Sequence, residues 1–237
     1  MTTGWRAVLV AGLVAGFVSG PAQPLAAQTP VVVELFTSQG CASCPPADAN
    51  LAELAARDDV IALALHVDYW DYLGWKDPFA HAGFTERQKS YARAVGSKMI
   101  YTPQVIVAGT ARVPGFKTAE IASLIRQHAA AAGTVQLELL REGNALRIRA
   151  TAEPPLDRAV QIVLVRYRPA ETVTIERGEN AGRTETYHNI VTAWNAIAQW
   201  AGDAPIRVDA VADGPDPVVV IVQEPGPGPI IAAARLR

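Results

Sequence analysis

Two short apolar runs, separated by a helical pattern, constrain the fold of this chain more than any other feature. The runs are Val31–Phe36 and Val60–Val67, and each is almost continuous rather than alternating. Strands that are buried on both faces of a sheet show this pattern. Between them, Leu51, Leu54 and Ala55 recur at helical spacing. We expect a parallel strand–helix–strand unit, whose right-handed closure brings both carboxyl ends to one edge of the sheet.

The two cysteines of the chain fall between these runs, as Cys41-Ala42-Ser43-Cys44. A disulfide across so short a loop stabilises a fold by only about 2 kcal/mol in the loop-entropy model. Structural zinc sites typically use four protein ligands, and the chain contains no second cysteine pair. The spacing favours a redox-active pair, and a local structural disulfide or half of a metal site are the alternatives. Because proline disfavours helical geometry in the residue before it, Pro45 and Pro46 predict that the pair lies on a turn ahead of the helix.

Residues 1–27 have the pattern of a secretory signal peptide. A single positive charge, Arg6, precedes the apolar run Ala7–Val18 and the small-residue ending Leu25-Ala26-Ala27. The run is shorter than the about 20 apolar residues that a membrane-spanning helix needs. We expect an exported protein, periplasmic or secreted, with no stable membrane span after cleavage. Export would place the cysteines where disulfides form and persist.

The overall charge argues against a nucleic-acid partner. The chain contains 21 Lys and Arg and 23 Asp and Glu, for a formal net charge of −2. Proteins that bind nucleic acids or anionic membrane surfaces usually present an excess of basic residues. We therefore expect neither kind of partner.

A change in sequence texture near Gly133 predicts two domains after the signal peptide. In residues 28–133, apolar runs alternate with helical patterns. Within this domain, residues from about 69 to 100 are expected to form a helical insertion rich in aromatic residues. That insertion is either a recognition surface beside the cysteines or a small core, and we favour the core. Residues 134–237 contain short β-like runs, including a hairpin around Glu142-Gly143-Asn144, with a helix expected near residues 190–200. A β-rich, sandwich-like domain is predicted there.

Several segments carry a resemblance to a known family. They are Glu34-Leu35-Phe36-Thr37-Ser38-Gln39-Gly40-Cys41 with Cys44-Pro45-Pro46-Ala47-Asp48, His66-Val67-Asp68-Tyr69-Trp70-Asp71-Tyr72-Leu73-Gly74-Trp75, Tyr101-Thr102-Pro103-Gln104, and Arg177-Gly178-Glu179-Asn180-Ala181-Gly182-Arg183. They resemble a secreted thioredoxin-like family catalogued as domain of unknown function 1223. The resemblance implies an α/β thioredoxin-like domain, ordered βαβ, helical insertion and ββα, followed by the β-rich C-terminal domain.

The resemblance also implies roles for individual residues. Cys41 would be the attacking sulfur and Cys44 the resolving one, and exchange would pass through a mixed disulfide. Glu34 would be the buried acid that relays a proton for the resolving thiol. Pro103 would follow a cis peptide bond and face the disulfide, while Thr102 would offer its backbone to an extended substrate chain.

These observations support one main hypothesis and two alternatives. The main hypothesis is a thiol–disulfide oxidoreductase that acts on an envelope protein or a small thiol, needs no cofactor beyond its disulfide, and is recycled by a redox partner. One alternative is a non-catalytic thioredoxin-fold binding module with a permanent disulfide. The other is a copper(I)-handling protein in which Cys41, Cys44 and His66 form a soft ligand set.

Overall fold

The structure is a computed structural model that describes residues 1–2, 29–131 and 133–237. Apart from its first two residues, the expected signal peptide lies outside this range. The described residues form three α-helices, one short 3₁₀ helix and eleven strands. In chain order they are β1 (Val31–Thr37), α1 (Pro45–Ala55), β2 (Val60–His66), η1 (Asp71–Leu73), α2 (Ala82–Ala94), β3 (Gln104–Val107), β4 (Ala111–Pro114), α3 (Thr118–Ala129), β5 (Val135–Glu142), β6 (Ala145–Ala152), β7 (Val160–Thr174), β8 (Thr184–Trp200), β9 (Ile206–Val211), β10 (Val218–Gln223) and β11 (Ile230–Leu236).

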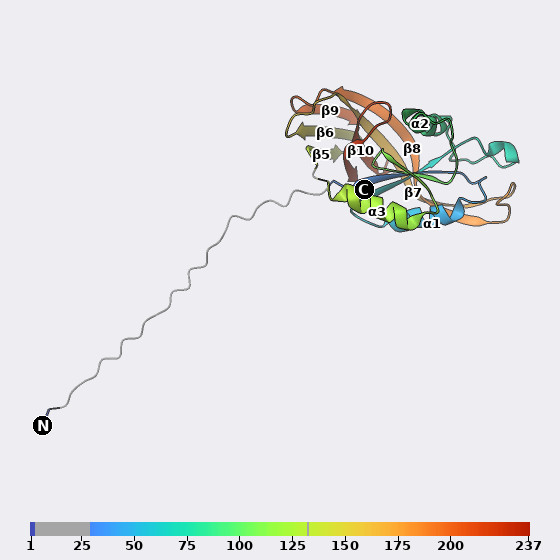
Figure 1. Cartoon of the computed structure of the whole chain (residues 1–237), viewed down its shortest axis with the longest axis horizontal. Coiled ribbons are helices and arrows are strands. Elements are labelled where there is room, and N and C mark those ends of the chain that lie inside the picture. Colours follow the sequence, from blue (N-terminus) through green and yellow to red (C-terminus); the bar gives the residue numbers. More distant parts are fainter. Residues whose placement is uncertain (3–28, 132) are drawn as a thin grey trace.

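Most of the described strands belong to one large mixed sheet. Its eight strands are ordered β11-β10-β7-β8-β2-β1-β3-β4, and the other three form a small sheet, β5-β6-β9. Strands β1 and β2 are parallel, with α1 between them in the chain, whereas β3 runs antiparallel to β1. Helices α1 and α3 lie on one side of the large sheet and α2 on the other (Figure 1).

The predicted fold class is wrong. We expected a thioredoxin-like α/β domain followed by a separate β-rich domain. Instead, β8 pairs with β2 through Ala64 and Ile190, so one sheet continues from the N-terminal part of the chain into the C-terminal part. The texture change near Gly133 marks only the connection between α3 and β5. The pattern of apolar residues indicates how deeply each strand is buried. It does not indicate which strand will pair with the open edge of β2.

The helix expected near residues 190–200 is also absent, because this segment belongs to strand β8. Strand β8 pairs with β7 along its whole length, and the register shifts between Ile162 and Val163 and between Arg166 and Tyr167. Each bulge inserts an unpaired residue and interrupts the alternation of side chains. The apolar residues of this segment therefore do not alternate strictly, and their spacing resembles that of a helix.

Strand β1 separates two cores, and this decides where its side chains act. Val33 and Leu35 pack with α1 and α3, whereas Val32 and Phe36 pack with α2. Each fully buried Leu or Phe contributes about 1.5–3 kcal/mol to folding. Because successive strand residues point to opposite faces, Glu34 lies on the α2 side and Thr37 on the α1 side.

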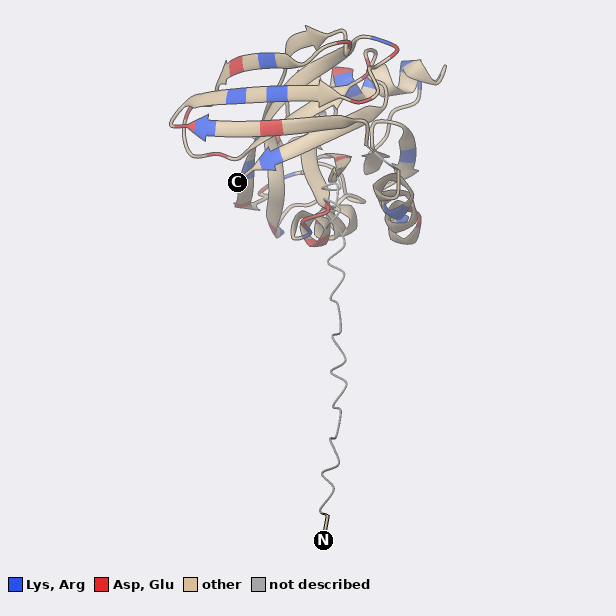
Figure 2. Ribbon diagram, turned by 90° about the vertical axis from the view of Figure 1, so that its left-hand side faces the viewer, with Lys and Arg blue, Asp and Glu red and all other residues tan. Residues whose placement is uncertain are grey.

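The small sheet covers the outer half of the large one and presents a charged face to solvent. Its inner residues, such as Leu146 and Ile148, pack against Ile162 and Val220 of the large sheet. On its outer face, basic and acidic residues are interspersed along the strands (Figure 2), for example in the Arg147–Glu142 ion pair at 3.1 Å. Mixed charge of this kind is typical of a solvated sheet face. None of the helices within the described ranges is long and apolar enough to traverse a bilayer.

Candidate functional site

Cys41 and Cys44 form a disulfide directly before α1, and their Cα atoms lie 5.4 Å apart. Helix α1 begins at Pro45 with Cys44 as its N-cap, which confirms that the pair precedes the helix. Both cysteines are buried, whereas Ala42 and Ser43 between them are exposed. The Ser43 hydroxyl oxygen lies 3.5 Å from Cys41 Sγ. Another molecule would therefore approach the sulfurs from the side of Ala42 and Ser43.

The start of α1 offers no free N–H group to a thiolate. A helix normally leaves its first four N–H groups without partners, and these groups favour an anion. Here Pro45 and Pro46 have no N–H, and the amides of Ala47 and Asp48 both donate to the Cys44 carbonyl, at 2.9 and 3.1 Å. A thiolate at Cys41 or Cys44 therefore receives less help from this helix than the position alone suggests.

Contacts from distant segments hold the loop that leads to Cys41. Asn180, in the connection between β7 and β8, donates from Nδ2 to the carbonyls of Gln39 and Cys41, at 2.9 Å each. The amide of Gln39 donates to Asp77 Oδ2 at 2.9 Å, and Trp75 Nε1 donates to the Gln39 side chain at 2.8 Å. The backbone on both sides of Gly40 is thus fixed by groups that lie far away in the sequence.

Thr102 and Pro103 lie beside the same loop. The bond between them is cis, as the family resemblance implied. Trp70 Nε1 donates to the Thr102 hydroxyl at 2.7 Å. On its other side, Trp70 packs so closely against Gly40 that a Cβ added there would lie 3.0 Å from the Trp70 Cβ. Trp70 therefore bridges the cysteine loop and the cis peptide bond.

Gly115 provides a second link between these segments. A Cβ at Gly115 would lie 2.8 Å from Pro103 Cβ and 2.9 Å from the Cβ of Ala47 in α1. Only glycine fits so close an approach of the backbone. The structure thus brings the two predicted substrate-binding residues next to the start of α1, where the disulfide lies.

A group of buried polar residues lies behind the disulfide, where β1 and β2 end. Thr37 and His66 are register partners at the ends of these strands. His66 Nδ1 and Asp77 Oδ2 are 2.7 Å apart, and both side chains are fully buried. The rings of Phe79 and Tyr187 pack edge-on against the imidazole, at centroid distances of 5.3 and 5.0 Å.

Asp48 adds an unpaired carboxyl group to this cluster. Its Oδ1, together with Thr37 Oγ1 and His66 Nε2, is shielded from solvent and has no hydrogen-bond partner among the described residues. Burial raises the pKa of Asp48 from 3.8 to about 7, against the opposing effects of His66 and Thr37, and nearby Asp77 raises it further. Asp48 lies one helical turn after Cys44, so an acid that titrates near neutral pH stands behind the disulfide.

Glu34, the predicted proton relay, is placed elsewhere. It is fully buried on the α2 side of β1, where Arg87 Nε and Nη2 donate to its two oxygens at 2.6 and 2.9 Å. The Tyr91 hydroxyl donates to the same carboxylate at 2.6 Å. Burial, followed by the Glu34 charge, raises the pKa of Tyr91 well above its usual value. The structure thus does not bring Glu34 together with the cysteines.

The ligand set of the copper alternative is not assembled either. Cys41 and Cys44 are joined to each other, and His66 Nδ1 is occupied by Asp77. Across residues 29–131 and 133–237, no group of three or more His, Cys, Asp or Glu side chains is placed to hold a metal ion.

The aromatic residues of the insertion divide between two roles. Phe84 and Tyr91 belong to the core on the α2 side, as we favoured, whereas Tyr72 is exposed. Trp70 and Trp75 instead contact the cysteine loop. The core interpretation is confirmed for Phe84 and Tyr91, and the recognition interpretation stays a prediction.

Sequence reasoning missed three residues of the site. Asn180 falls within the Arg177–Arg183 segment that supported the family resemblance, which was the available signal for it. Asp48 could have been found from its spacing of one helical turn after Cys44. Asp77 carried no signal, because its role depends on how the insertion folds back onto His66.

Together these features define a β-rich protein with a large mixed sheet and a buried disulfide directly before its first helix. The chain belongs to the family described as "Protein of unknown function (DUF1223)", whose model matches residues 32–223. No protein among the curated ones matches it.

Two solved structures are similar over most of the chain. One is Protein AGR_C_4864 from Agrobacterium tumefaciens, with 32% identity and a TM-score of 0.75, where the match covers 87% of this chain and 93% of that one. The other is HBP35 of Porphyromonas gingivalis, with 14% identity and a TM-score of 0.66, covering 88% and 75% respectively. The second likeness concerns the fold alone.

Proposed function

We propose that this protein is an exported thiol–disulfide oxidoreductase that uses Cys41 and Cys44. Its reduced form would donate electrons to a disulfide in another envelope protein, or to the disulfide form of a small thiol. The observation that carries the proposal is the disulfide before α1 with the unpaired Asp48 carboxyl one turn behind it. A disulfide with only a structural role does not exchange protons, so it does not require an acid that titrates near neutral pH. Charges that lack a partner are costly to bury and cluster at functional sites.

The proposed exchange has two steps. In the reduced protein, the Cys41 thiolate attacks a disulfide of the partner, forms a mixed disulfide and releases one partner sulfur as a thiolate, which takes up a proton. The Cys44 thiol then loses its proton, attacks Cys41 Sγ and releases the second partner sulfur. The partner disulfide gains two electrons and two protons, and the protein is left with its own disulfide.

Asp48 would act as the proton acceptor for Cys44 in the second step. A carboxyl group with a pKa of about 7 is present in both protonation states near neutral pH, so it can take a proton from a thiol and later return it. This is the role that the family resemblance implied for Glu34. We assign it to Asp48 because Glu34 is engaged by Arg87 and Tyr91 on the other side of the sheet.

The proposed direction of electron flow follows from the surroundings of the sulfurs. The first turn of α1 offers them no free N–H group, and ionised Asp48 would repel a thiolate. Both effects destabilise the reduced, ionised form relative to the disulfide. A pair that favours its disulfide state is a good electron donor, as thioredoxin is at about −270 mV.

A redox titration of the mature chain against glutathione tests the proposal. We expect a reduction potential between about −200 and −300 mV, because exchange-active pairs lie above the range of structural disulfides. A potential below about −300 mV would mark a permanent structural bridge and overturn the proposal. As a control, the Cys41→Ala/Cys44→Ala variant should show no redox transition, since the chain has no other cysteine.

A further inference from the structure

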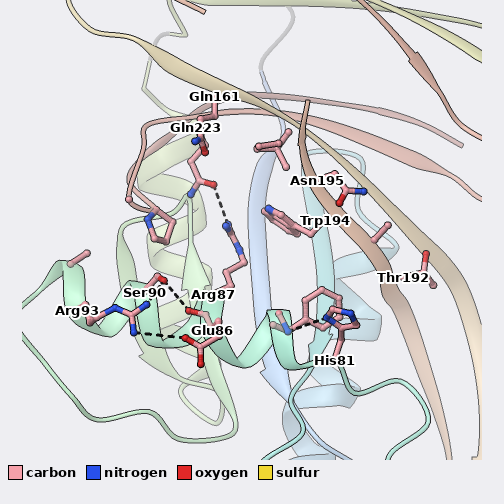
Figure 3. Close-up of a pocket in the computed structure, with 18 residues that line it drawn as sticks. His81, Glu86, Arg87, Ser90, Arg93, Gln161, Thr192, Trp194, Asn195 and Gln223 are labelled. Carbon is pink, nitrogen blue, oxygen red and sulfur yellow. Dashed lines mark hydrogen bonds and ion pairs between the residues drawn. The ribbon is translucent and has the colours of Figure 1, made fainter. Parts of the chain in front are cut away.

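A cavity of about 870 Å³ opens between α2 and the strands β7, β8 and β10. It belongs to the α2 side of the sheet, whereas Asp48 lies on the α1 side. Strands β2 and β8 share only the Ala64–Ile190 pair, whereas β8 is paired with β7 along its whole length. The space left between β8 and α2 is lined by side chains from both (Figure 3). Its volume lies within the range of about 300–1,000 Å³ that is common for small-molecule sites.

A guanidinium group in a fixed position forms one wall of this cavity. Arg87 is 12% exposed, and it donates to both oxygens of Glu34, to the Tyr91 hydroxyl and to the Gln223 side chain. All these bonds use Nε and Nη2. Arg87 Nη1 makes no hydrogen bond within the described part of the chain, and Arg87 lines the cavity. Arg87 therefore presents a free pair of N–H groups, held in place by the groups behind it.

Trp194 and two side-chain amides supply further features of a binding site. The Trp194 ring packs over Arg87, with the guanidinium carbon 3.7 Å from the ring centre. Figure 3 shows Trp194 at the middle of the cavity, with Gln161 and Asn195 around it. Neither amide side chain makes a hydrogen bond to another described residue, so both are available to a ligand. Val163 and Phe84 add apolar surface.

We propose that this cavity binds a small organic carboxylate that carries a flat apolar group. The carboxylate would accept hydrogen bonds from Arg87 Nη1, since guanidinium groups match carboxylate geometry. The flat group would pack against Trp194 and Val163, and the Gln161 and Asn195 amides would bind remaining polar atoms. This site is independent of the proposed disulfide exchange and needs neither cysteine.

The buried ion pair is the strongest argument for a ligand. A buried Arg–Glu pair usually adds little to stability, and apolar residues of similar volume often replace it without loss. Here the pair borders a cavity, and Tyr91 and Gln223 orient the guanidinium further. Such support behind a single charged group is what a preorganised binding site requires.

Isothermal titration calorimetry with 1-naphthoate and its neutral analogue 1-naphthamide tests the proposal on the mature chain. We expect naphthoate to bind at least about tenfold more tightly than the amide, a difference of about 1.4 kcal/mol. The Glu34→Gln variant keeps the Arg87 charge, so it should still bind the acid more tightly than the amide. The double variant Glu34→Gln/Arg87→Met removes both charges and should lose the preference for the acid.

Two further variants separate binding from folding. Trp194→Ala should weaken both probes, because it removes the packing surface and leaves Arg87 in place. Arg207→Gln, on the outer face of the small sheet, should change neither, and thermal unfolding of each variant checks that it is folded. Equal affinity of the wild type for acid and amide, absence of binding by both, or a retained acid preference in the folded double variant would each overturn the proposal.

Discussion

The carboxyl groups of Glu34 and Asp48 lie on opposite sides of the large sheet, and they are surrounded in opposite ways. Glu34 receives hydrogen bonds from Arg87 and Tyr91, so both of its carboxylate oxygens have partners. Asp48 has one solvent-shielded oxygen with no hydrogen-bond partner among the described residues, and burial raises its pKa to about 7. A paired acid orients its neighbours, whereas an unpaired acid exchanges protons. This contrast underlies our two proposals, ligand binding on the α2 side and redox chemistry on the α1 side.

The largest effect on stability should come from breaking the Arg87–Glu34 ion pair on the α2 side. Arg87→Met leaves Glu34 buried without a cation, which should lower the free energy of unfolding by about 3–5 kcal/mol. The double variant Glu34→Gln/Arg87→Met should recover most of this loss, because no uncompensated charge remains. Urea unfolding of both variants measures the difference. Equal stability of the single and double variants would show that Glu34 is not held as an ion.

On the α1 side, Asp48 should make stability depend on pH. Between about pH 4 and pH 7 the folded chain keeps a proton that the unfolded chain has released, so the free energy of unfolding falls as pH rises. The pKa change corresponds to at most about 4 kcal/mol, less any screening at the exposed part of the residue. Asp48→Asn should remove this dependence. Urea unfolding at several pH values measures it, and parallel profiles for variant and wild type would contradict the assignment.

Loosening the loop that leads to Cys41 should lower the free energy of unfolding by a smaller amount. Asn180→Ala leaves the carbonyls of Gln39 and Cys41 without their donor, which should lower the free energy of unfolding by about 1–3 kcal/mol. We also expect dithiothreitol to reduce the disulfide faster in this variant, because the loop is freer to open. The exposed Asn195 provides a matched control, and Asn195→Ala should stay within about 0.5 kcal/mol of the wild type. An unchanged reduction rate would mean that Asn180 does not limit access to the sulfurs.

The smallest effect should follow from adding a methyl group beside Trp70. Gly40→Ala places a Cβ 3.0 Å from the Trp70 Cβ, and relief of this crowding should cost about 1 kcal/mol. Gly133→Ala is the control, because its nearest new contact would be Thr29 Oγ1 at 3.4 Å. Thermal unfolding compares the two variants. If both melt like the wild type, the packing of Trp70 against the cysteine loop is looser than described.

The sequence predicted local elements well and their assembly poorly. The strands on either side of the cysteines, the turn ahead of α1 and the hairpin of β5 and β6 follow from short-range patterns. The eight-stranded sheet does not, because the junction of β2 with β8 rests on the single pair Ala64–Ile190. Local spacing cannot encode a contact between such distant residues.

The placement of Glu34 away from the cysteines has a specific cause. An amphipathic strand shows which of its faces meets solvent, but β1 is buried on both faces and gives no such signal. Whether Glu34 points toward the disulfide or away from it depends on which side α1 packs. That choice is made by tertiary structure, and Asp48 then occupies the position behind the sulfurs.

The central claim, that Asp48 handles protons for the disulfide, is tested most directly by reduction kinetics. The rate of reduction by dithiothreitol should be measured for wild type and Asp48→Asn from about pH 5 to about pH 9. The ratio of the two rates cancels the ionisation of the reagent. Protonated Asp48 can donate to the departing sulfur, and ionised Asp48 repels it, so the ratio of wild type to variant should fall as pH rises through about 7. A ratio that stays constant across this range would contradict the account.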